Sequence, residues 1–369
     1  MWAYNNPVQV RFGAGAMDSL ADQIKGRRYA IVTYPEPYFA ELSASIAERS
    51  GPAALIVDDV APNPDYKHLL PQCVRFAELE TQPDVIVALG GGSVIDSAKV
   101  FAAAGGSFSN VARYLETGQG ADAFVNTPII AVPTTAGTGS EVTCWATVWD
   151  EARGKKFSLA HRDLYPEAAI VDPALMLGKP YGLTLSTGLD TLSHALESIW
   201  NVNANPISAR FAVASAKRIL RDLPSLLGDL QNLDLRASMA EASLMAGMAF
   251  SNTKTAIAHN ISYPITLGWG VQHGIACSFT LPSVLRSVIG LGGFREEALK
   301  EIFGEDLGRG ADDLDRFLNA VGVGTRFHDH GIPAHRWPGI IRDAFAGERG
   351  RNFIGTLDRF MATQDALAT

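Results

Sequence analysis

The chain has 369 residues, of which 47% are hydrophobic and 19% charged, and it carries a formal net charge of −8 at pH 7. This composition is typical of a globular protein long enough for two domains. The acidic balance without a basic run argues against nucleic-acid binding, and no uncharged apolar run approaches the roughly 20 residues of a membrane helix.

Targeting and redox features of the sequence indicate the cytoplasm. The first ten residues, MWAYNNPVQV, lack the basic and apolar regions of a signal peptide. The three cysteines, Cys73, Cys144 and Cys277, are odd in number and share no metal-type spacing, which fits a reducing compartment. We therefore predict a cytoplasmic protein whose cysteines are small buried hydrophobic residues, with neither nucleic acid nor membrane as a partner.

The first half of the chain alternates short apolar runs with amphipathic segments. The apolar runs predict strands at residues 29–33, 53–57, 84–89 and 128–132, with further short strands at residues 154–159 and 168–171. The segments between the first runs predict helices at residues 39–49, 66–80 and 93–104. Continuous apolar strands separated by helices are typical of a parallel sheet covered on both faces, so we predict an α/β domain.

From about Thr184 onward the periodicity is almost entirely helical. Helices are predicted at residues 189–200, 207–220, 235–250 and 313–321. Pro224 and Gly322 are expected to mark interruptions between helices. We therefore predict two domains, an α/β domain of residues 1–175 and an all-α domain of residues 176–369.

A glycine-rich turn follows the third predicted strand. Gly90, Gly91, Gly92 and Ser93 lead into a helix that carries Asp96. Glycines let backbone N–H groups approach a phosphate, and a helix N-terminus adds unpaired donors and a partial positive charge. The spacing differs from both G-x-G-x-x-G and the P-loop, so a tight turn without a ligand is the alternative to a phosphate site.

A second loop, with Thr134, Thr135, Thr138 and Ser140, follows the next predicted strand. Hydroxyl groups and amides at the carboxyl end of a parallel strand suit a sugar-phosphate ligand, so the two loops predict the walls of a nucleotide cleft. Tyr34 follows the first strand, where NAD-binding sheets often have a carboxylate for the ribose. No lysine or arginine lies near Tyr34 to bind a 2′-phosphate, which favours NAD(H). No carboxylate stands at the position of Tyr34 to bind the ribose, which leaves NADP(H) open.

Four residues of the second half, Asp190, His194, His259 and His273, have the chemistry of a divalent-metal site. Asp190 and His194 are four residues apart, which places them on one face of a helix. His259 and His273 lie in apolar stretches, where burial without a charge partner is unfavourable. The ligand set is compatible with Fe(II), Zn(II), Mn(II) or Co(II). The alternative for the Asp190 pair alone is an aspartate in a first helical turn above a buried histidine.

The remaining histidines have more polar surroundings. His161 is intermediate and could face the cleft, and the others are predicted on the surface: His68, His328, His330 and His335.

The motifs GGGSxID, PTTxGTGSE, Asp172-Pro173 and GLDxLxHAxE, with the two later histidines, resemble the iron-containing (group III) alcohol dehydrogenases over essentially the whole chain. The resemblance implies an N-terminal dinucleotide-binding, Rossmann-like domain and a C-terminal all-α metal-binding domain. It implies that the four ligands hold Fe(II), with Zn(II) as an alternative, and that Lys156 lies close to the cofactor. It also implies a homodimer or a larger homo-oligomer.

Tyr263 departs from the common family pattern, in which a second histidine follows the third ligand by four residues. The surrounding sequence is similar to the phosphonoacetaldehyde reductase branch, also called 2-hydroxyethylphosphonate dehydrogenases. Tyr263 is therefore either a proton donor or relay, or a packing aromatic residue. A phosphonate needs cationic partners; Lys254 is the main candidate, and the weaker candidates are Arg153, Lys155, His161 and Arg351-Asn352.

We predict a metal-dependent, NAD(P)H-linked and reversible reduction of a small aldehyde to a primary alcohol, with phosphonoacetaldehyde as the first candidate. The metal would polarise the carbonyl oxygen while the nicotinamide delivers hydride. One alternative is a general short-chain alcohol dehydrogenase of the same family. A more distant alternative is a lyase of the dehydroquinate synthase type, which would need more cations near the metal and usually a glutamate in place of Asp190.

Overall fold

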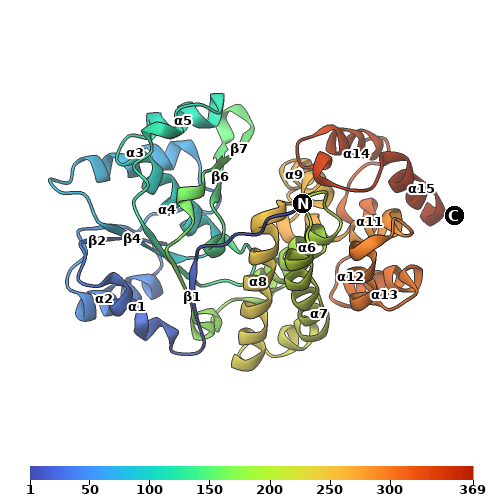
Figure 1. Cartoon of the computed structure of the whole chain (residues 1–369), viewed down its shortest axis with the longest axis horizontal. Coiled ribbons are helices and arrows are strands. Elements are labelled where there is room, and N and C mark those ends of the chain that lie inside the picture. The colour runs from blue at the N-terminus through green and yellow to red at the C-terminus, as the bar shows by residue number, and fades with distance from the viewer. Residues whose placement is uncertain (369) are drawn as a thin grey trace. The chain divides into compact units, whose positions relative to one another are not determined.

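A six-stranded parallel sheet forms the centre of the N-terminal half in the computed structural model, which describes residues 1–368 (Figure 1). The strand order is β1-β8-β5-β4-β2-β3. The strands are β1 Gln9–Phe12, β2 Tyr29–Val32, β3 Leu55–Val57, β4 Val85–Gly90, β5 Ile129–Pro133 and β8 Ala168–Val171. In register, Ile86 pairs with Ile129 and Gly90 pairs with Pro133, so β4 and β5 end together at the edge that carries the glycine turn.

Helices cover both faces of this sheet, because successive side chains of the central strands point to opposite faces. The helices are α1 Leu20–Ile24, α2 Pro37–Ser50, α3 Tyr66–Ala77, α4 Gly92–Ala104 and α5 Phe108–Thr117. Ala30 and Ile86 pack with apolar residues of α3, α4 and α5. Ile31 and Val87 pack with apolar residues of α1 and α2 on the other face. The predicted α/β class is confirmed.

Two strands were not predicted. β1 is an edge strand of only four residues with a largely exposed pattern, so it gives little hydrophobic signal. β6 (Trp145–Asp150) and β7 (Lys155–Ala160) form a separate antiparallel hairpin. The segment predicted at residues 154–159 is therefore the second strand of a hairpin. The turn between its strands is closed by the 3₁₀ helix η4 (Glu151–Arg153) and by Gly154 in a left-handed conformation at φ 62°.

The C-terminal half is helical, as predicted. Its helices are α6 Tyr181–Ile199, α7 Pro206–Gly228, α8 Leu233–Thr253, α9 Ile257–Trp269, α10 His273–Ser278, α11 Leu281–Val288, α12 Gly293–Phe303, α13 Leu307–Ala320, α14 Trp337–Ala346 and α15 Leu357–Ala368. They share one apolar core that includes Leu189, Leu192 and Ile199 of α6 and Leu223 and Leu226 of α7.

Short 3₁₀ helices connect several of these elements. They are η1 Ala16–Ser19, η2 Ala121–Ala123, η3 Ser140–Val142, η5 Arg162–Leu164, η6 Pro173–Met176, η7 Phe327–His330 and η8 Gly350–Asn352.

Two helix boundaries differ from the prediction in ways that affect the site. Pro224 lies inside α7 and does not interrupt it. A proline removes one backbone donor, and burial of Leu223 and Leu226 on the same helix keeps the chain helical beyond it. α6 begins at Tyr181, eight residues earlier than predicted, so Asp190 lies in the helix interior. The alternative of an aspartate in a first helical turn is therefore wrong.

The chain divides into two compact units. One contains Asn6–Thr135 and Ser140–Met176, and the other contains Met1–Asn5, Ala136–Gly139 and Leu177–Thr369. The sheet belongs to the first unit and helices α6 to α15 to the second. None of the helices in the described part of the chain is long and apolar enough to cross a membrane.

Candidate functional site

The helical unit brings together the four predicted metal ligands. Asp190 and His194 lie one turn apart on α6, His259 lies near the start of α9, and His273 is the first residue of α10. The Nε2 atoms of His194, His259 and His273 lie 3.9, 3.4 and 3.9 Å from one oxygen, Asp190 Oδ1. Residues 83 positions apart along the chain thus converge on one carboxylate oxygen.

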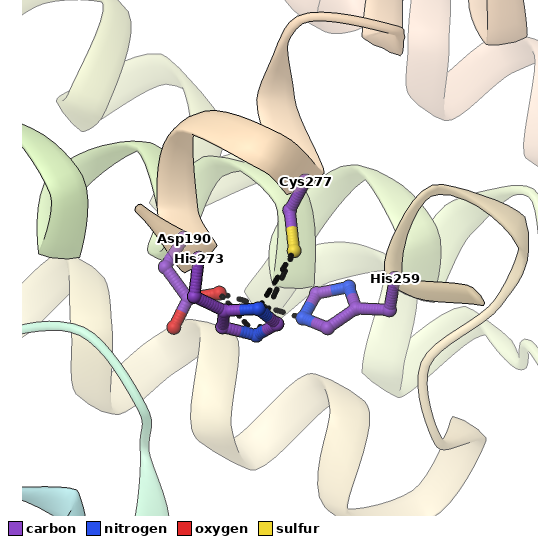
Figure 2. A group of neighbouring side chains, drawn as sticks. All are labelled: Asp190, His259, His273 and Cys277. Atoms are coloured by element: carbon purple, nitrogen blue, oxygen red, sulfur yellow. Dashed lines mark hydrogen bonds and ion pairs between the residues drawn. The ribbon is translucent and has the colours of Figure 1, made fainter. Parts of the chain in front are cut away.

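The polar atoms of this cluster fit a bound cation. Asp190 Oδ1, His194 Nδ1 and His259 Nε2 are buried and have no hydrogen-bond partner among the described residues. Unpaired buried polar atoms are costly, and ligand atoms about 2 Å from one ion would lie about 3.0–3.5 Å apart. Asp190, His259, His273 and Cys277 point toward one another in Figure 2, with their ligand atoms within 4.8 Å.

The protonation states of two cluster residues also suit a metal. Burial raises the pKa of Asp190, but the neighbouring His194, His259 and His273 lower it more, so this pKa lies well below its usual range. Burial lowers the pKa of His194 to about 4, against the opposing effect of Asp190. An ionised carboxylate and a neutral imidazole are the forms that coordinate a metal.

Glu197 fixes the orientation of His259. Its buried carboxylate accepts a hydrogen bond from the His259 ring, with Nδ1 2.6 Å from Oε2. It also accepts backbone N–H bonds from Ala256, Ala258 and His259 at 2.9, 2.5 and 3.1 Å. Glu197 therefore caps the N-terminus of α9, where N–H groups have no partner within the helix. Because the ring donates through Nδ1, Nε2 is the atom that faces Asp190 and is placed to coordinate a metal.

No role was predicted for Glu197, although its spacing from two of the ligands carried a signal. Asp190, His194 and Glu197 are separated by four and three residues, which places all three on one face of α6. Cys277 was predicted to be a small buried hydrophobic residue, and its burial is confirmed. Its Sγ lies 3.8 and 3.7 Å from Nδ1 and Nε2 of His273, one turn earlier on α10.

Aromatic side chains border the cluster. The His194 ring stacks on Phe250 at 4.3 Å and on His259 at 4.6 Å between ring centres. The Tyr263 ring is nearly parallel to the His273 ring, at 5.9 Å and 6°. The structure therefore places Tyr263 beside a predicted ligand.

Lys254 has a different environment from that of Tyr263. It is exposed and follows the last residue of α8 with φ 63°. Its carbonyl oxygen accepts a hydrogen bond from Asn201 Nδ2 at 3.1 Å. Among the described residues its ammonium group has no hydrogen-bond or ion-pair partner.

The predicted glycine turn forms a narrow cradle in the sheet unit. A Cβ built on Gly91 would lie 3.1 Å from Thr135 Oγ1 and 3.3 Å from the Tyr34 hydroxyl. α4 begins at Gly92, so the N–H groups of Gly92 and Ser93 have no helical partner, whereas the Val94 N–H already donates to the Gly91 carbonyl at 3.0 Å. Thr134 Oγ1 is buried without a hydrogen-bond partner among the described residues. These features fit a phosphate-containing ligand.

Asp96 and Ser140 are held in a buried polar network with Lys99, a residue that was not predicted to take part in the site. Ser140 Oγ donates to Asp96 Oδ1 at 2.5 Å. Lys99 Nζ lies within hydrogen-bond distance of Ser140 O, Ser140 Oγ, Thr143 Oγ1 and Trp145 O, at 2.7 to 3.1 Å. Burial lowers the pKa of Lys99 to about 8. These contacts join the second loop to α4 and to the start of β6.

The other predicted cofactor residues have separate positions. The Ser93 hydroxyl accepts the Asn63 N–H at 3.2 Å. The Lys156 ammonium lies 5.1 Å from the centre of the Trp149 ring. Thr138 belongs to the helical unit, whereas Thr134, Thr135 and Ser140 belong to the sheet unit.

The weaker candidates for anion binding are partly accounted for by other contacts. Arg153 pairs with Glu116 at 2.8 Å and also with Asp150. Lys155 is exposed, and the half-buried His161 ring packs edge-on against Phe124. Arg351 Nη1 donates to the Ala346 carbonyl at 3.3 Å.

The predicted exposure of the remaining histidines and the predicted burial of the remaining cysteines are each correct only in part. His68 and His330 are half-buried, whereas His328 and His335 are exposed as predicted. The His330 Nε2 atom lies 2.8 Å from the Gly324 carbonyl oxygen, which holds that ring against the protein. Cys73 is buried as predicted, whereas Cys144 is only half-buried.

The sequence matches known proteins over both units. Residues 7–173 match the family described as Iron-containing alcohol dehydrogenase, and residues 184–356 match the Fe-containing alcohol dehydrogenase family, C-terminal. The chain is 30% identical over 350 residues to the NAD-dependent methanol dehydrogenase of Bacillus methanolicus, covering 90% of each protein. It is 34% identical over 289 residues to the 1,3-propanediol dehydrogenase of Klebsiella pneumoniae, covering 78% of this chain and 73% of that protein.

The fold also matches solved structures. Sulfoacetaldehyde reductase from Bifidobacterium kashiwanohense, in complex with NAD+, superimposes with a TM-score of 0.90 and 30% identity, over 100% of this chain and 99% of that chain. The 1,3-propanediol oxidoreductase structure gives a TM-score of 0.85 with 26% identity, over 99% of each chain. The resemblance found in the sequence is thus confirmed: the chain belongs to the iron-containing alcohol dehydrogenase family and is an NAD(P)-dependent, metal-dependent alcohol dehydrogenase.

Proposed function

We propose that the enzyme reduces phosphonoacetaldehyde to 2-hydroxyethylphosphonate with NADH, at an Fe(II) ion held by Asp190, His194, His259 and His273. Zn(II) is the alternative ion for the same ligands. The observation that carries the proposal is the convergence of three imidazole Nε2 atoms on Asp190 Oδ1. We further propose that the protein acts as a homodimer or a larger homo-oligomer.

The choice of a two-carbon anionic aldehyde has two supports. The enzyme from Bifidobacterium kashiwanohense, at 30% identity, is a reductase of sulfoacetaldehyde, which also joins a two-carbon aldehyde to a tetrahedral oxyanion. Tyr263, which stacks on His273, replaces the histidine that the family pattern has at this position. A changed residue beside the ligands favours a substrate that differs from simple alcohols.

Each group of side chains has a distinct task in this reaction. When bound, the metal ion supplies Lewis-acid polarisation of the substrate oxygen. Asp190 stays ionised, and Glu197 keeps the proton of His259 on Nδ1. Gly91, Tyr34 and Thr135 form the cradle for the dinucleotide, which supplies the hydride. Tyr263 is the candidate to deliver the proton that completes the alcohol.

A second candidate function is the oxidation and reduction of short neutral alcohols and aldehydes. The 30% identity to a methanol dehydrogenase and the 34% identity to a 1,3-propanediol dehydrogenase favour it. Both functions use the same ligands and cofactor, so only the substrate separates them.

An aldehyde panel tests the proposal. Metal-depleted protein is reloaded with Fe(II) or Zn(II), and NADH or NADPH oxidation is followed with phosphonoacetaldehyde, sulfoacetaldehyde, propanal and acetaldehyde. We expect the highest kcat/KM with phosphonoacetaldehyde and NADH, and loss of turnover with a chelator. A higher kcat/KM for propanal would instead support the second candidate, and no NADH oxidation with any aldehyde would reject both.

A further inference from the structure

Arg349 lies next to Tyr263 with most of its hydrogen-bonding capacity unused. Its guanidinium carbon is 5.1 Å from the centre of the Tyr263 ring. Its Nε donates to Thr255 Oγ1 at 2.8 Å. Among the described residues no carboxylate lies within 4.0 Å of it, and its two terminal nitrogens donate no hydrogen bond. An arginine carries five N–H donors, so four of them remain for a ligand.

This environment differs from that of two other arginines in the same unit. Arg218 and Arg286 pair with carboxylates at 2.8 and 2.5 Å. Arg349 is half-buried, so part of its surface is withdrawn from water without a compensating negative charge. A cation over an aromatic face gains some stabilisation from the ring. It still has no anion to pair with, and a planar guanidinium suits an oxyanion.

The segment that carries Arg349 is packed against the start of α9. A Cβ on Gly347 would lie 2.3 Å from Asn260 Nδ2, and a Cβ on Gly350 would lie 2.1 Å from the Ala344 carbonyl oxygen. Asn352 Nδ2 donates to the Thr255 carbonyl at 2.9 Å. These contacts fix the backbone on both sides of Arg349, so its side chain is held beside Tyr263.

A sequence of contacts therefore links Arg349 to the metal ligands. The guanidinium lies over Tyr263, the Tyr263 ring is parallel to His273, and His273 Nε2 lies 3.9 Å from Asp190 Oδ1. A substrate with its aldehyde oxygen at the ligand cluster would have its other end close to Tyr263. An oxyanion at that end would lie on the Tyr263 side of the cluster, where Arg349 offers its unused donors.

We propose that Arg349 is the specificity-determining residue that binds the oxyanion of a small anionic aldehyde, with the Tyr263 ring beneath its guanidinium. This inference rests on the proposed function and assigns the anion to Arg349 in place of Lys254. Lys254 is exposed and its ammonium group makes no contact that would hold it near the cluster. Phosphonate and sulfonate present the same oxygen geometry to the arginine, and the substrates of the test distinguish them.

Arg349→Gln tests the inference in the Fe(II)-loaded enzyme with saturating NADH. We expect the KM for phosphonoacetaldehyde or sulfoacetaldehyde, whichever the unmodified enzyme prefers, to rise by about 10- to 100-fold, as for loss of a charge-assisted hydrogen-bonded pair. The KM for propanal should stay within about threefold, because propanal has no anion to lose. The dissociation constant of ethylphosphonate, measured by calorimetry without turnover, should rise in parallel.

Matched variants make the result specific. Arg342→Gln removes an exposed arginine of α14 and should change none of these constants. Arg349→Lys keeps the charge without the planar guanidinium, so its KM for the anionic aldehyde should lie between those of the unmodified enzyme and of Arg349→Gln. If Arg349→Gln does not fold, the KM of Arg349→Lys tests the role of Arg349 instead. Equal changes with propanal, no change with the anionic aldehyde, or a selective effect of Lys254→Gln in place of Arg349→Gln would each overturn the inference.

The same data separate this inference from the proposed function. If the unmodified enzyme prefers sulfoacetaldehyde and Arg349→Gln removes that preference, the phosphonate substrate is wrong and the role of Arg349 stands. If the unmodified enzyme prefers propanal and does not bind ethylphosphonate, both are wrong.

Discussion

Glu197→Gln is expected to weaken the metal site without removing a ligand. The glutamate carboxylate accepts four hydrogen bonds, two on each oxygen. A glutamine side chain of the same shape replaces one of those oxygens with an NH2 group. If its oxygen serves Ala258 and His259, the NH2 group faces the Ala256 N–H and the His259 ring. The NH2 group then opposes the Ala256 N–H, so two donors face each other there. On the other side, the NH2 group can donate a hydrogen bond to His259 Nδ1.

The expected magnitudes follow from these two changes. A donation to Nδ1 shifts the ring proton of His259 to Nε2, the atom that faces Asp190 at 3.4 Å, and a protonated nitrogen cannot coordinate. Loss of such an orienting partner typically costs about 10- to 100-fold in metal affinity. The unpaired Ala256 N–H should cost about 1–3 kcal/mol of unfolding free energy even without metal.

Competition with a chromophoric chelator gives the metal dissociation constant, and urea unfolding of the metal-free protein gives the stability. Glu241→Gln is the matched control, because Glu241 pairs with Arg218 at the surface with 34% of its side chain exposed. Such pairs are worth about 0–1 kcal/mol, and this one should leave the metal affinity unchanged. Glu197→Gln protein with normal metal affinity and normal stability would refute the role assigned to Glu197.

Three further predictions concern proton delivery, pH and the nucleotide. Tyr263→Phe should lower kcat by about 100-fold or more if the phenol delivers the proton; an unchanged kcat across the pH range would reject that role. Burial raises the pKa of Glu141 to about 7, against about 4.3 in the unfolded chain. As pH rises, the unfolded state loses this proton before the folded state does, so the unmodified protein should lose about 3–4 kcal/mol of unfolding free energy between pH 4.3 and pH 7. Glu141→Gln should abolish this pH-dependent loss, which urea unfolding at several pH values measures. Gly91→Val should raise the NADH dissociation constant by about tenfold, by fluorescence titration, since its side chain would fill the space beside Thr135 and Tyr34; unchanged NADH binding would contradict the cradle.

Elements with a strong local pattern could be predicted from the sequence. The apolar run of β4 leads directly into the glycine turn, and its six residues are all buried. β1 and β6 were missed because their burial is partial: β1 is mostly exposed, and β6 alternates over only six residues. A short alternating segment gives too few positions to separate a strand from a loop.

The ligands could be predicted because their chemistry is local, whereas the residues that position them depend on long-range contacts. Asp190 and His194 are one helical turn apart in the sequence. The bonds from Glu197 to the start of α9 join positions 59 to 62 residues apart, and the bond between Arg349 and Thr255 spans 94 residues. No spacing in a single sequence specifies such pairs.

Lys254 shows how proximity in sequence can mislead. It lies five residues before His259, which suggested a place in the site. The chain leaves α8 at Lys254 with a positive φ of 63° and an extended ψ of 174°, and the side chain is exposed. Arg349 is distant in the sequence but lies beside Tyr263 in the structure.

Anomalous diffraction from crystals loaded with Fe(II), collected at the iron absorption edge, would show directly whether Asp190, His194, His259 and His273 hold the metal. We expect one strong peak about 2 Å from Asp190 Oδ1, a ring nitrogen of His194, and Nε2 of His259 and His273. Absence of a peak at this cluster, or an ion bound by Cys277 in place of His194, would contradict the proposed ligand set.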